Sequence, residues 1–275
     1  MESEKKRILV PCDFTEVAKN ALKNAYVLAK RMKAKILLFH VVKKEKEIVD
    51  AIEKLKAFAE NSIKNSDIEI EFLAKEGNIY DTIKATAEEI GAKFVIMGTH
   101  GITGIQKFLG SKALKVIANS MVPFIVVQEE PDEKNYLSKI VVPIDFTLEN
   151  KEKLRWAYYL SVYFKSKMFL HVANISNEEL LKKVKANLLF AKKYFEEREV
   201  EYEINIVKTA YNFHDSVLEY SKEINANGIL IMTTPDPNIT DYIFAAEEQK
   251  IIANARIPVI CVSPRIDTKI LRGFY

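Results

Sequence analysis

Residues 7–15 read Arg-Ile-Leu-Val-Pro-Cys-Asp-Phe-Thr, and residues 139–147 read Lys-Ile-Val-Val-Pro-Ile-Asp-Phe-Thr. In both stretches a short apolar run ends at a proline, and an aspartate follows two positions later. A short, continuous apolar run is typical of a strand that is buried on both faces of a parallel sheet. Because the whole signature returns after 132 residues, the sequence predicts a duplicated unit.

Shorter matches extend the repeat along both halves. A four-residue match at an offset of 131 makes His40 equivalent to His171, and a three-residue match at an offset of 135 makes Met97 equivalent to Met232. The offset changes by only a few residues, so we expect one domain duplicated. We assign residues 1–130 to a first domain, 131–138 to a linker and 139–275 to a second domain.

Each half is predicted to alternate five strands with helices, which gives a parallel sheet covered on both faces. Thr15 is the expected N-cap of the first helix. The last strands, 122–127 and 257–262, would be bare apolar edges, so we expect the halves to pair or bury them as an internal pseudo-dimer. The other expected elements are strands near 8–12, 35–42, 68–74, 93–98, 139–143, 167–173, 201–208 and 228–233, and helices near 45–65, 78–90 and 111–119.

The composition excludes several classes of protein. The chain has 275 residues, with 41 Lys and Arg against 38 Asp and Glu, so its formal charge is only +3. This balance argues against a partner such as nucleic acid or a membrane surface. No apolar run reaches the ~18 residues of a membrane span, and the run near the start is shorter than a signal-peptide core of roughly 7–15 residues. Cys12 and Cys261 lack disulfide or metal spacing and are expected to be buried thiols of a cytoplasmic protein.

Glycines cluster between a predicted strand and a predicted helix, in residues 98–104 and at Gly110-Ser111. Glycine lets backbone N–H groups approach phosphate oxygens, and a helix N-terminus attracts anions. The spacing matches neither the Walker A loop nor the GxGxxG pattern. On the residues alone, a tight connection and a phosphate-binding loop both remain open.

The chain also resembles a known family, the universal stress proteins, in their tandem two-domain form. The resemblance covers nearly the whole chain, and its carriers are residues 10–15, His40-Val41, residues 97–101 with Gly110-Ser111, and residues 122–127. It implies two Rossmann-like α/β domains, each with a five-stranded parallel sheet in the order 3-2-1-4-5. It also implies an adenine nucleotide, ATP or ADP or AMP with magnesium as an expected companion, at the carboxyl edge of the sheet.

The resemblance assigns the nucleotide site to the first half. Asp13 and the Val41 backbone would meet the adenosine, and the glycine loop would wrap the phosphates. In nucleotide-binding members nine residues separate the second loop glycine from the Gly-Ser/Thr pair, whereas eight separate Gly101 from Gly110 here. The implied binding residues are Pro11, Asp13, Val41, Gly98, His100, Gly101, Gly110, Ser111, Lys112 and Ala113.

The second half lacks these glycines. At an offset of 135, Gly98 becomes Thr233, and the Gly110-Ser111 pair becomes Ala245-Ala246. Pro235 offers no N–H group, and nearby acids would repel phosphate. We expect this loop to be degenerate and the second half to serve as a structural or interaction partner.

We therefore expect a stress-response regulatory protein that binds one adenine nucleotide. No catalytic constellation and no metal-ligand spacing is recognisable in the sequence. Two alternatives stay open, a slow ATPase or nucleotide-transfer enzyme and a nucleotide-free dimerising scaffold. The resemblance also implies a homodimer of tandem chains, with protein partners that the sequence does not identify.

Overall fold

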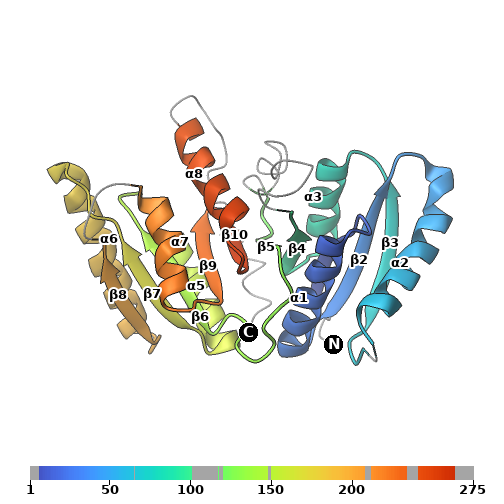
Figure 1. The fold of residues 1–275 in the computed structure, drawn as a ribbon, viewed down its shortest axis with the longest axis horizontal. Coiled ribbons are helices and arrows are strands. Elements are labelled where there is room, and N and C mark those ends of the chain that lie inside the picture. Colours follow the sequence, from blue (N-terminus) through green and yellow to red (C-terminus); the bar gives the residue numbers. More distant parts are fainter. Residues whose placement is uncertain are drawn as a thin grey trace.

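The computed structural model describes residues 6–64, 66–100, 117, 120–147, 150–207, 212–233 and 241–263. Ten strands form one sheet, in the order β3-β2-β1-β4-β5-β10-β9-β6-β7-β8 (Figure 1). Each half therefore has the 3-2-1-4-5 order that the family resemblance implies. The strands are β1 (Arg7–Pro11), β2 (Lys35–Val42), β3 (Ile70–Glu76), β4 (Phe94–Gly98), β5 (Phe124–Val127), β6 (Lys139–Ile144), β7 (Lys167–Val172), β8 (Tyr202–Ile206), β9 (Gly228–Met232) and β10 (Val259–Val262).

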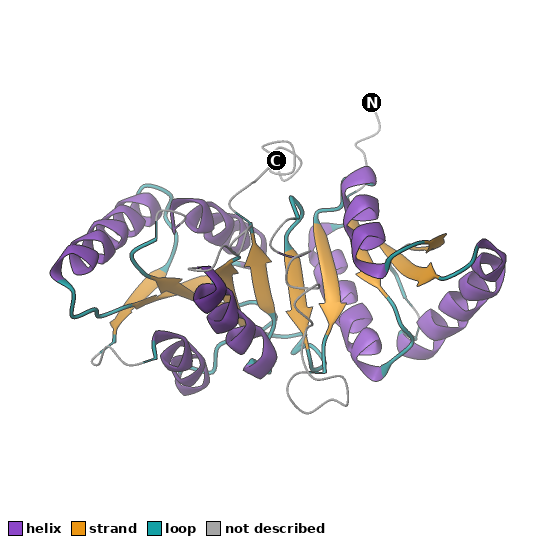
Figure 2. Ribbon diagram, turned by 90° about the horizontal axis from the view of Figure 1, so that it is seen from above, coloured by secondary structure: helices purple, strands orange, loops and turns teal. Residues whose placement is uncertain are grey.

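Helices cover both faces of the sheet (Figure 2). One core cluster joins the sheet to α1, α2, α5 and α6, and a second joins its other face to α3, α7 and α8. In the described part of the chain, no helix is long and apolar enough to cross a membrane. The helices are α1 (Glu16–Met32), α2 (Ile48–Ser62), α3 (Ile79–Glu89), α5 (Asn150–Phe164), α6 (Glu178–Glu196), α7 (Phe213–Glu223) and α8 (Asp241–Asn254), with a 3-10 turn η1 (Glu45–Glu47) before α2.

The two halves join through their last strands. β5 and β10 pair antiparallel, with Ile125 opposite Ile260 at the centre, whereas the other strand pairs are parallel. Both isoleucines are fully buried. The expected pairing of the two apolar edges is confirmed, and it removes both edges from solvent.

Side chains from both halves also meet beside this seam. The ring of Phe94 on β4 packs edge-on against Trp156 on α5, with 5.9 Å between centroids. The guanidinium of Arg31 on α1 donates to the carbonyls of Tyr136 and Glu133, 2.9 Å each. Helix α1 thus holds the segment that connects the halves.

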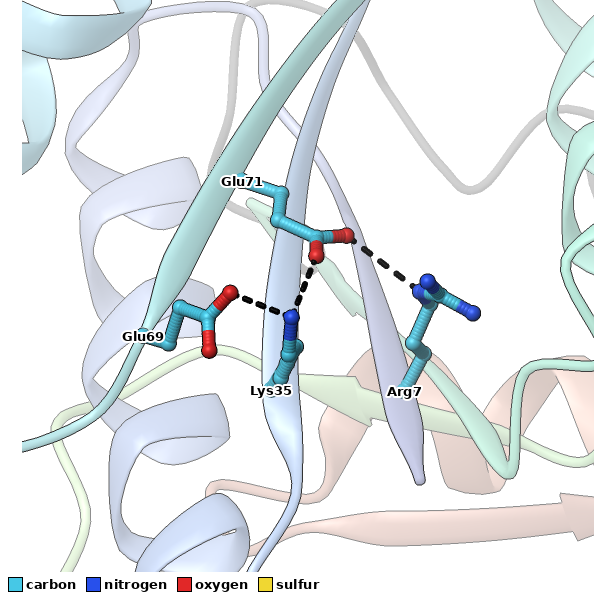
Figure 3. A network of polar contacts seen from close by, with 4 residues as sticks. All are labelled: Arg7, Lys35, Glu69 and Glu71. Carbon is cyan, nitrogen blue, oxygen red and sulfur yellow. Dashed lines mark hydrogen bonds and ion pairs between the residues drawn. The ribbon is translucent and has the colours of Figure 1, made fainter. Parts of the chain in front are cut away.

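A charged network crosses the amino ends of β1, β2 and β3 (Figure 3). Lys35 forms ion pairs with Glu69 and Glu71, and Arg7 Nε donates to Glu71 at 3.2 Å. These partners raise the pKa of Lys35 and lower that of Glu71. In the second half, Lys167 forms the matching ion pairs, at 3.0 Å with Glu201 and at 2.6 Å with Glu203. The network marks the strand ends opposite to the candidate site.

The strand register corrects one equivalence that the sequence matches suggested. Pro11 lies beside Phe39, and Pro143 lies beside His171, so His171 corresponds to Phe39 and His40 corresponds to a valine. The true offset here is 132, not 131. Because strand side chains alternate between faces, the two histidines lie on opposite faces of the sheet.

A similar shift occurs at the end of the fourth strand of each half. Gly98 pairs with Val127, and Met232 pairs with Val262. Since Val127 and Val262 are 135 apart, the counterpart of Gly98 is Met232, and the expected match to Thr233 is wrong by one residue.

Candidate functional site

The candidate site lies at the carboxyl ends of β1, β2 and β4. The chain runs from β1 to β2 and β3 on one side, and then returns to place β4 on the other side of β1. In open α/β sheets, such a reversal of strand order opens a crevice where ligands bind. The structure places five of the implied residues at this edge: Pro11 ends β1, Asp13 follows it, Val41 is near the end of β2, Gly98 ends β4 and His100 follows it.

Asp13 sits in a tight turn that leads into α1. Its Oδ1 accepts hydrogen bonds from the N–H group (3.1 Å) and the hydroxyl (2.5 Å) of Thr15. Thr15 in turn caps the helix, since its Oγ1 accepts from the N–H of Ala18. The predicted N-cap is confirmed, and the turn leaves the Asp13 side chain exposed.

Phe14, which is not among the implied binding residues, lies directly after Asp13 at the same edge of the sheet. Its backbone is left-handed, with φ at 65°, so the chain turns sharply between Asp13 and the helix. Its ring lies 4.7 Å from the His40 ring and 5.9 Å from Phe58. A positive φ is not visible in a sequence, because phenylalanine gives no signal for it.

His40 contacts the end of β1. Its Nδ1 lies 2.7 Å from the Cys12 carbonyl oxygen. Since a carbonyl oxygen can only accept, Nδ1 carries the proton in this contact. Cys12 and Cys261 are both buried and unbonded to each other, as expected, and burial raises the pKa of the Cys12 thiol to about 12.

Gly98 is required by packing. A Cβ at this position would lie 2.2 Å from the carbonyl oxygen of Val17 in the first turn of α1. This close approach brings the end of β4 against the helix that Thr15 caps. The remaining implied residues, Gly101, Gly110, Ser111, Lys112 and Ala113, lie outside the described residues.

The second half repeats the aspartate turn, but side chains of two neighbouring helices donate to the carbonyls beside it. Asp145 Oδ1 accepts from the N–H group (2.8 Å) and hydroxyl (2.5 Å) of Thr147. Asn187 on α6 donates to the carbonyls of Asp145 and Thr147, 2.8 Å each. The buried amine of Lys153 donates to the carbonyl of Pro143. The side chains of the second half therefore occupy the polar groups at this end of β6.

His171 belongs to a separate buried cluster in the second half. Its Nε2 lies 2.8 Å from the Ser216 hydroxyl, and Asn205 donates to its Nδ1 at 3.0 Å. The rings of Phe213 and Tyr220 stack on it. Burial lowers its pKa to about 4, so the imidazole is neutral. The sequence match to His40 concealed this arrangement.

Comparisons with known proteins agree with this geometry. A family model described as "Universal stress protein family" matches residues 5–128. Universal stress protein MJ0577 of Methanocaldococcus jannaschii is 31% identical over 156 residues, which cover 46% of this chain and 96% of that protein. A second protein of that organism, universal stress protein MJ0531, is also 31% identical and is covered over 85% of its length.

The fold of the whole chain also has solved counterparts. The crystal structure of a universal stress protein from Archaeoglobus fulgidus superimposes with a TM-score of 0.70 at 18% identity. The match covers 94% of this chain and 97% of that one, so both halves are included. The chain therefore belongs to the universal stress protein family, as a tandem-domain member.

Proposed function

We propose that the first half of this protein binds one adenine nucleotide (ATP, ADP or AMP) at the carboxyl edge of its sheet, and that the protein acts as a nucleotide-responsive regulator in stress. The observation that carries the proposal is the exposed Asp13 carboxylate at the reversal of strand order, between the ends of β2 and β4. Ligands bind at this position in open α/β sheets. Family membership supports the choice of an adenine nucleotide.

Each group at the edge suits one part of the nucleotide. Thr15 donates two hydrogen bonds to Oδ1 of Asp13, and we assign Oδ2 of Asp13 to the ribose hydroxyls. The N–H and C=O groups of Val41 would read the edge of the base. The phosphates would extend past Gly98 and His100 toward residues 101–113, and magnesium would arrive with a triphosphate.

The second half is proposed to bind no nucleotide and to act as the structural partner of the first, with the boundaries 1–130, 131–138 and 139–275. The amide of Asn187 and the amine of Lys153 already bond the carbonyls at the end of β6. The glycine at the end of β4 is replaced by Met232 at the end of β9. A ligand would have to displace these side chains.

The duplication supplies a matched control for the test. Calorimetric titration with ATP and magnesium should show one site per chain. Asp13→Ala should weaken binding about ten- to hundredfold, as expected for the loss of a hydrogen bond to a charged group. Asp145→Ala removes the same kind of turn from the second half and should leave the affinity unchanged. Equal losses in both variants, or no binding by the wild type, would refute the proposal.

A further inference from the structure

The ladder between β1 and β2 ends earlier than its counterpart in the second half. The last backbone bond between these strands in the described residues runs from the N–H of Cys12 to the carbonyl of Phe39, at 2.7 Å. The next acceptor along β1 is the Cys12 carbonyl. The Nδ1–H group of His40 takes it, also at 2.7 Å.

In the second half the same ladder continues for one more bond. The N–H of Ala173 donates to the carbonyl of Ile144 at 2.9 Å. At the offset of 132 shown by the register, Ala173 corresponds to Val41, and Ile144 to Cys12. The residue that corresponds to His40 is valine, which has no donor to offer.

The peptide groups of β2 point alternately toward β1 and β3. The N–H of Lys35 bonds Lys6 on the β1 side, and the N–H of Ile36 bonds Glu69 on the β3 side. Because this alternation continues along a strand, odd-numbered residues of β2 face β1. The N–H and C=O groups of Val41 therefore point to the β1 side of β2, at a level beyond the end of β1 at Pro11. No bond from this N–H to Cys12 occurs in the described structure.

We propose that His40 is a positioning residue for the nucleotide base: by occupying the Cys12 carbonyl, it leaves the Val41 N–H for a ligand. The ligand chemistry that fits is a purine edge with a ring nitrogen acceptor beside an exocyclic amine, as in adenine. Hypoxanthine has a protonated nitrogen and a carbonyl at these positions and fits less well. This inference rests on the proposed function for its ligand, but the backbone claim can be tested without one.

The surroundings of His40 favour the required geometry. The centroids of the His40 and Phe14 rings are 4.7 Å apart, and Phe14 lies within the turn that Asp13 and Thr15 form. The Phe14 ring in turn contacts Phe58 on α2, with 5.9 Å between the centroids, so the turn beside the imidazole is packed against that helix. The side chain that would read the ribose and the one that frees the backbone are thus parts of one local structure.

Amide hydrogen exchange of the intact chain without nucleotide tests the backbone claim. The Val41 amide should exchange faster than the Ala173 amide, its bonded counterpart in the same molecule. His40→Val should protect the Val41 amide, because the ladder can then form its next bond to Cys12. His40→Gln retains a side-chain donor and should leave Val41 exchanging fast. A Val41 amide that is already as protected as Ala173 in the wild type would overturn the inference.

Titrations with ATP and ITP then test the consequence for binding. The wild type should prefer ATP, and His40→Val should weaken ATP binding about two- to tenfold, the range of a single net hydrogen bond, with little change for ITP. His40→Gln should restore the preference. If ATP and ITP bind equally well to the wild type, the role in base selection is wrong. If neither binds, the proposed function fails, while the exchange experiment still decides the role of His40.

Discussion

At the residue scale, His171 shows how burial fixes a protonation state. It is 2% exposed, stacks with two aromatic rings, and has partners for both ring nitrogens. Burial lowers its pKa from 6.5 to about 4. At a pH between these two values, His171 binds a proton in the unfolded chain but not in the folded chain.

This difference predicts a pH dependence of stability. Because the folded pKa is lowered, the stabilisation is complete above pH 6.5 and is lost as the pH falls toward 4. We expect about 2 kcal/mol of unfolding free energy to be lost from this group between pH 7 and pH 5. His171→Phe, which copies Phe39 of the first half, should remove that part of the slope. Urea unfolding of both proteins at the two pH values measures it, and equal slopes would contradict the assignment.

Two glycines are expected to be sensitive to substitution for different physical reasons. Alanine at Gly98 would place a methyl group 2.2 Å from the Val17 carbonyl oxygen, so Gly98→Ala should destabilise the protein by about 1–3 kcal/mol through overpacking. Gly91 has a φ of 59° but open space around it, so Gly91→Ala should cost only the left-handed backbone penalty of about 1–2 kcal/mol. Chemical unfolding compares them, and both should be less stable than the wild type. An unaffected Gly98→Ala variant would show that the strand end can move away from α1.

The sequence predicted the Thr15 cap and a set of residues that the structure places in part at one edge of the sheet, but it misplaced some equivalences between the halves. Asp13 and the cap at Thr15 were predictable, because an aspartate-x-threonine turn after a buried strand has a recognisable pattern. The pairing of His40 with His171 was wrong because a one-residue shift keeps the apolar character of a doubly buried strand while it exchanges the faces. Only the register revealed that the halves differ at His40.

At the scale of elements, α1 connects the site to the linker. Its first turn is capped by Thr15 at the site, and Arg31 in its last turn bonds two linker carbonyls. In the middle of the helix, Asn20 donates to the carbonyl of Gln128 and Asn24 donates to the carbonyl of Glu129. The helix thus fixes the path by which the chain leaves the first half.

Arg31→Ala should therefore loosen the linker. Removal of the guanidinium leaves the Tyr136 and Glu133 carbonyls without this donor, and we expect faster cleavage within residues 131–138 by a protease of broad specificity. Lys30→Ala is the control, because Lys30 lies in the same helical turn but pairs with Asp67 on the exposed surface and lies over the Tyr26 ring. Limited proteolysis followed by mass spectrometry locates the cut. Equal cleavage of the two variants would show that Arg31 does not restrain the linker.

The ten strands of the sheet were predicted within two residues at each end, and the third strand, at one edge of the sheet, is displaced by two residues at both ends. The sequence placed the third strand at 68–74 and the eighth at 201–208, but β3 spans Ile70–Glu76 and β8 spans Tyr202–Ile206. Edge strands are only half buried, so their apolar pattern is weaker. The offset between equivalent residues of the two halves is 134 at β4 and β9 but 135 at β5 and β10. The second half therefore has one more residue between these two strands, which the repeated motifs alone did not reveal.

At the scale of the whole molecule, one ten-stranded sheet and its core join the two halves. One core cluster contains residues of both halves, including Phe94 and Trp156. Trp156 is the single tryptophan of the chain, and its ring contacts Phe94 across the seam. Its fluorescence therefore reports on the junction itself.

We expect urea unfolding curves followed by tryptophan fluorescence and by far-ultraviolet circular dichroism to coincide in one transition, as two-state unfolding requires. Trp156→Ala should lower the free energy of unfolding by about 3–5 kcal/mol, which is usual for a buried aromatic residue. Its dichroism curve should still show one transition. Two separated transitions would mean that the halves unfold independently.

We propose that the protein has one nucleotide site, in the first half. There Asp13 is exposed, and the N–H group of Val41 on β2 makes no bond to β1 in the described structure. Native mass spectrometry of the intact chain with ATP and magnesium tests this stoichiometry, because it counts bound molecules per chain. At an ATP concentration a few times the wild-type Kd, we expect most chains of the wild type and of Asp145→Ala to carry one nucleotide, and only a small fraction of Asp13→Ala chains to carry one, because its affinity is expected to be about ten- to hundredfold lower. Two nucleotides per chain, or one that persists in Asp13→Ala and is lost in Asp145→Ala, would show that the site has been assigned to the wrong half or wrongly counted.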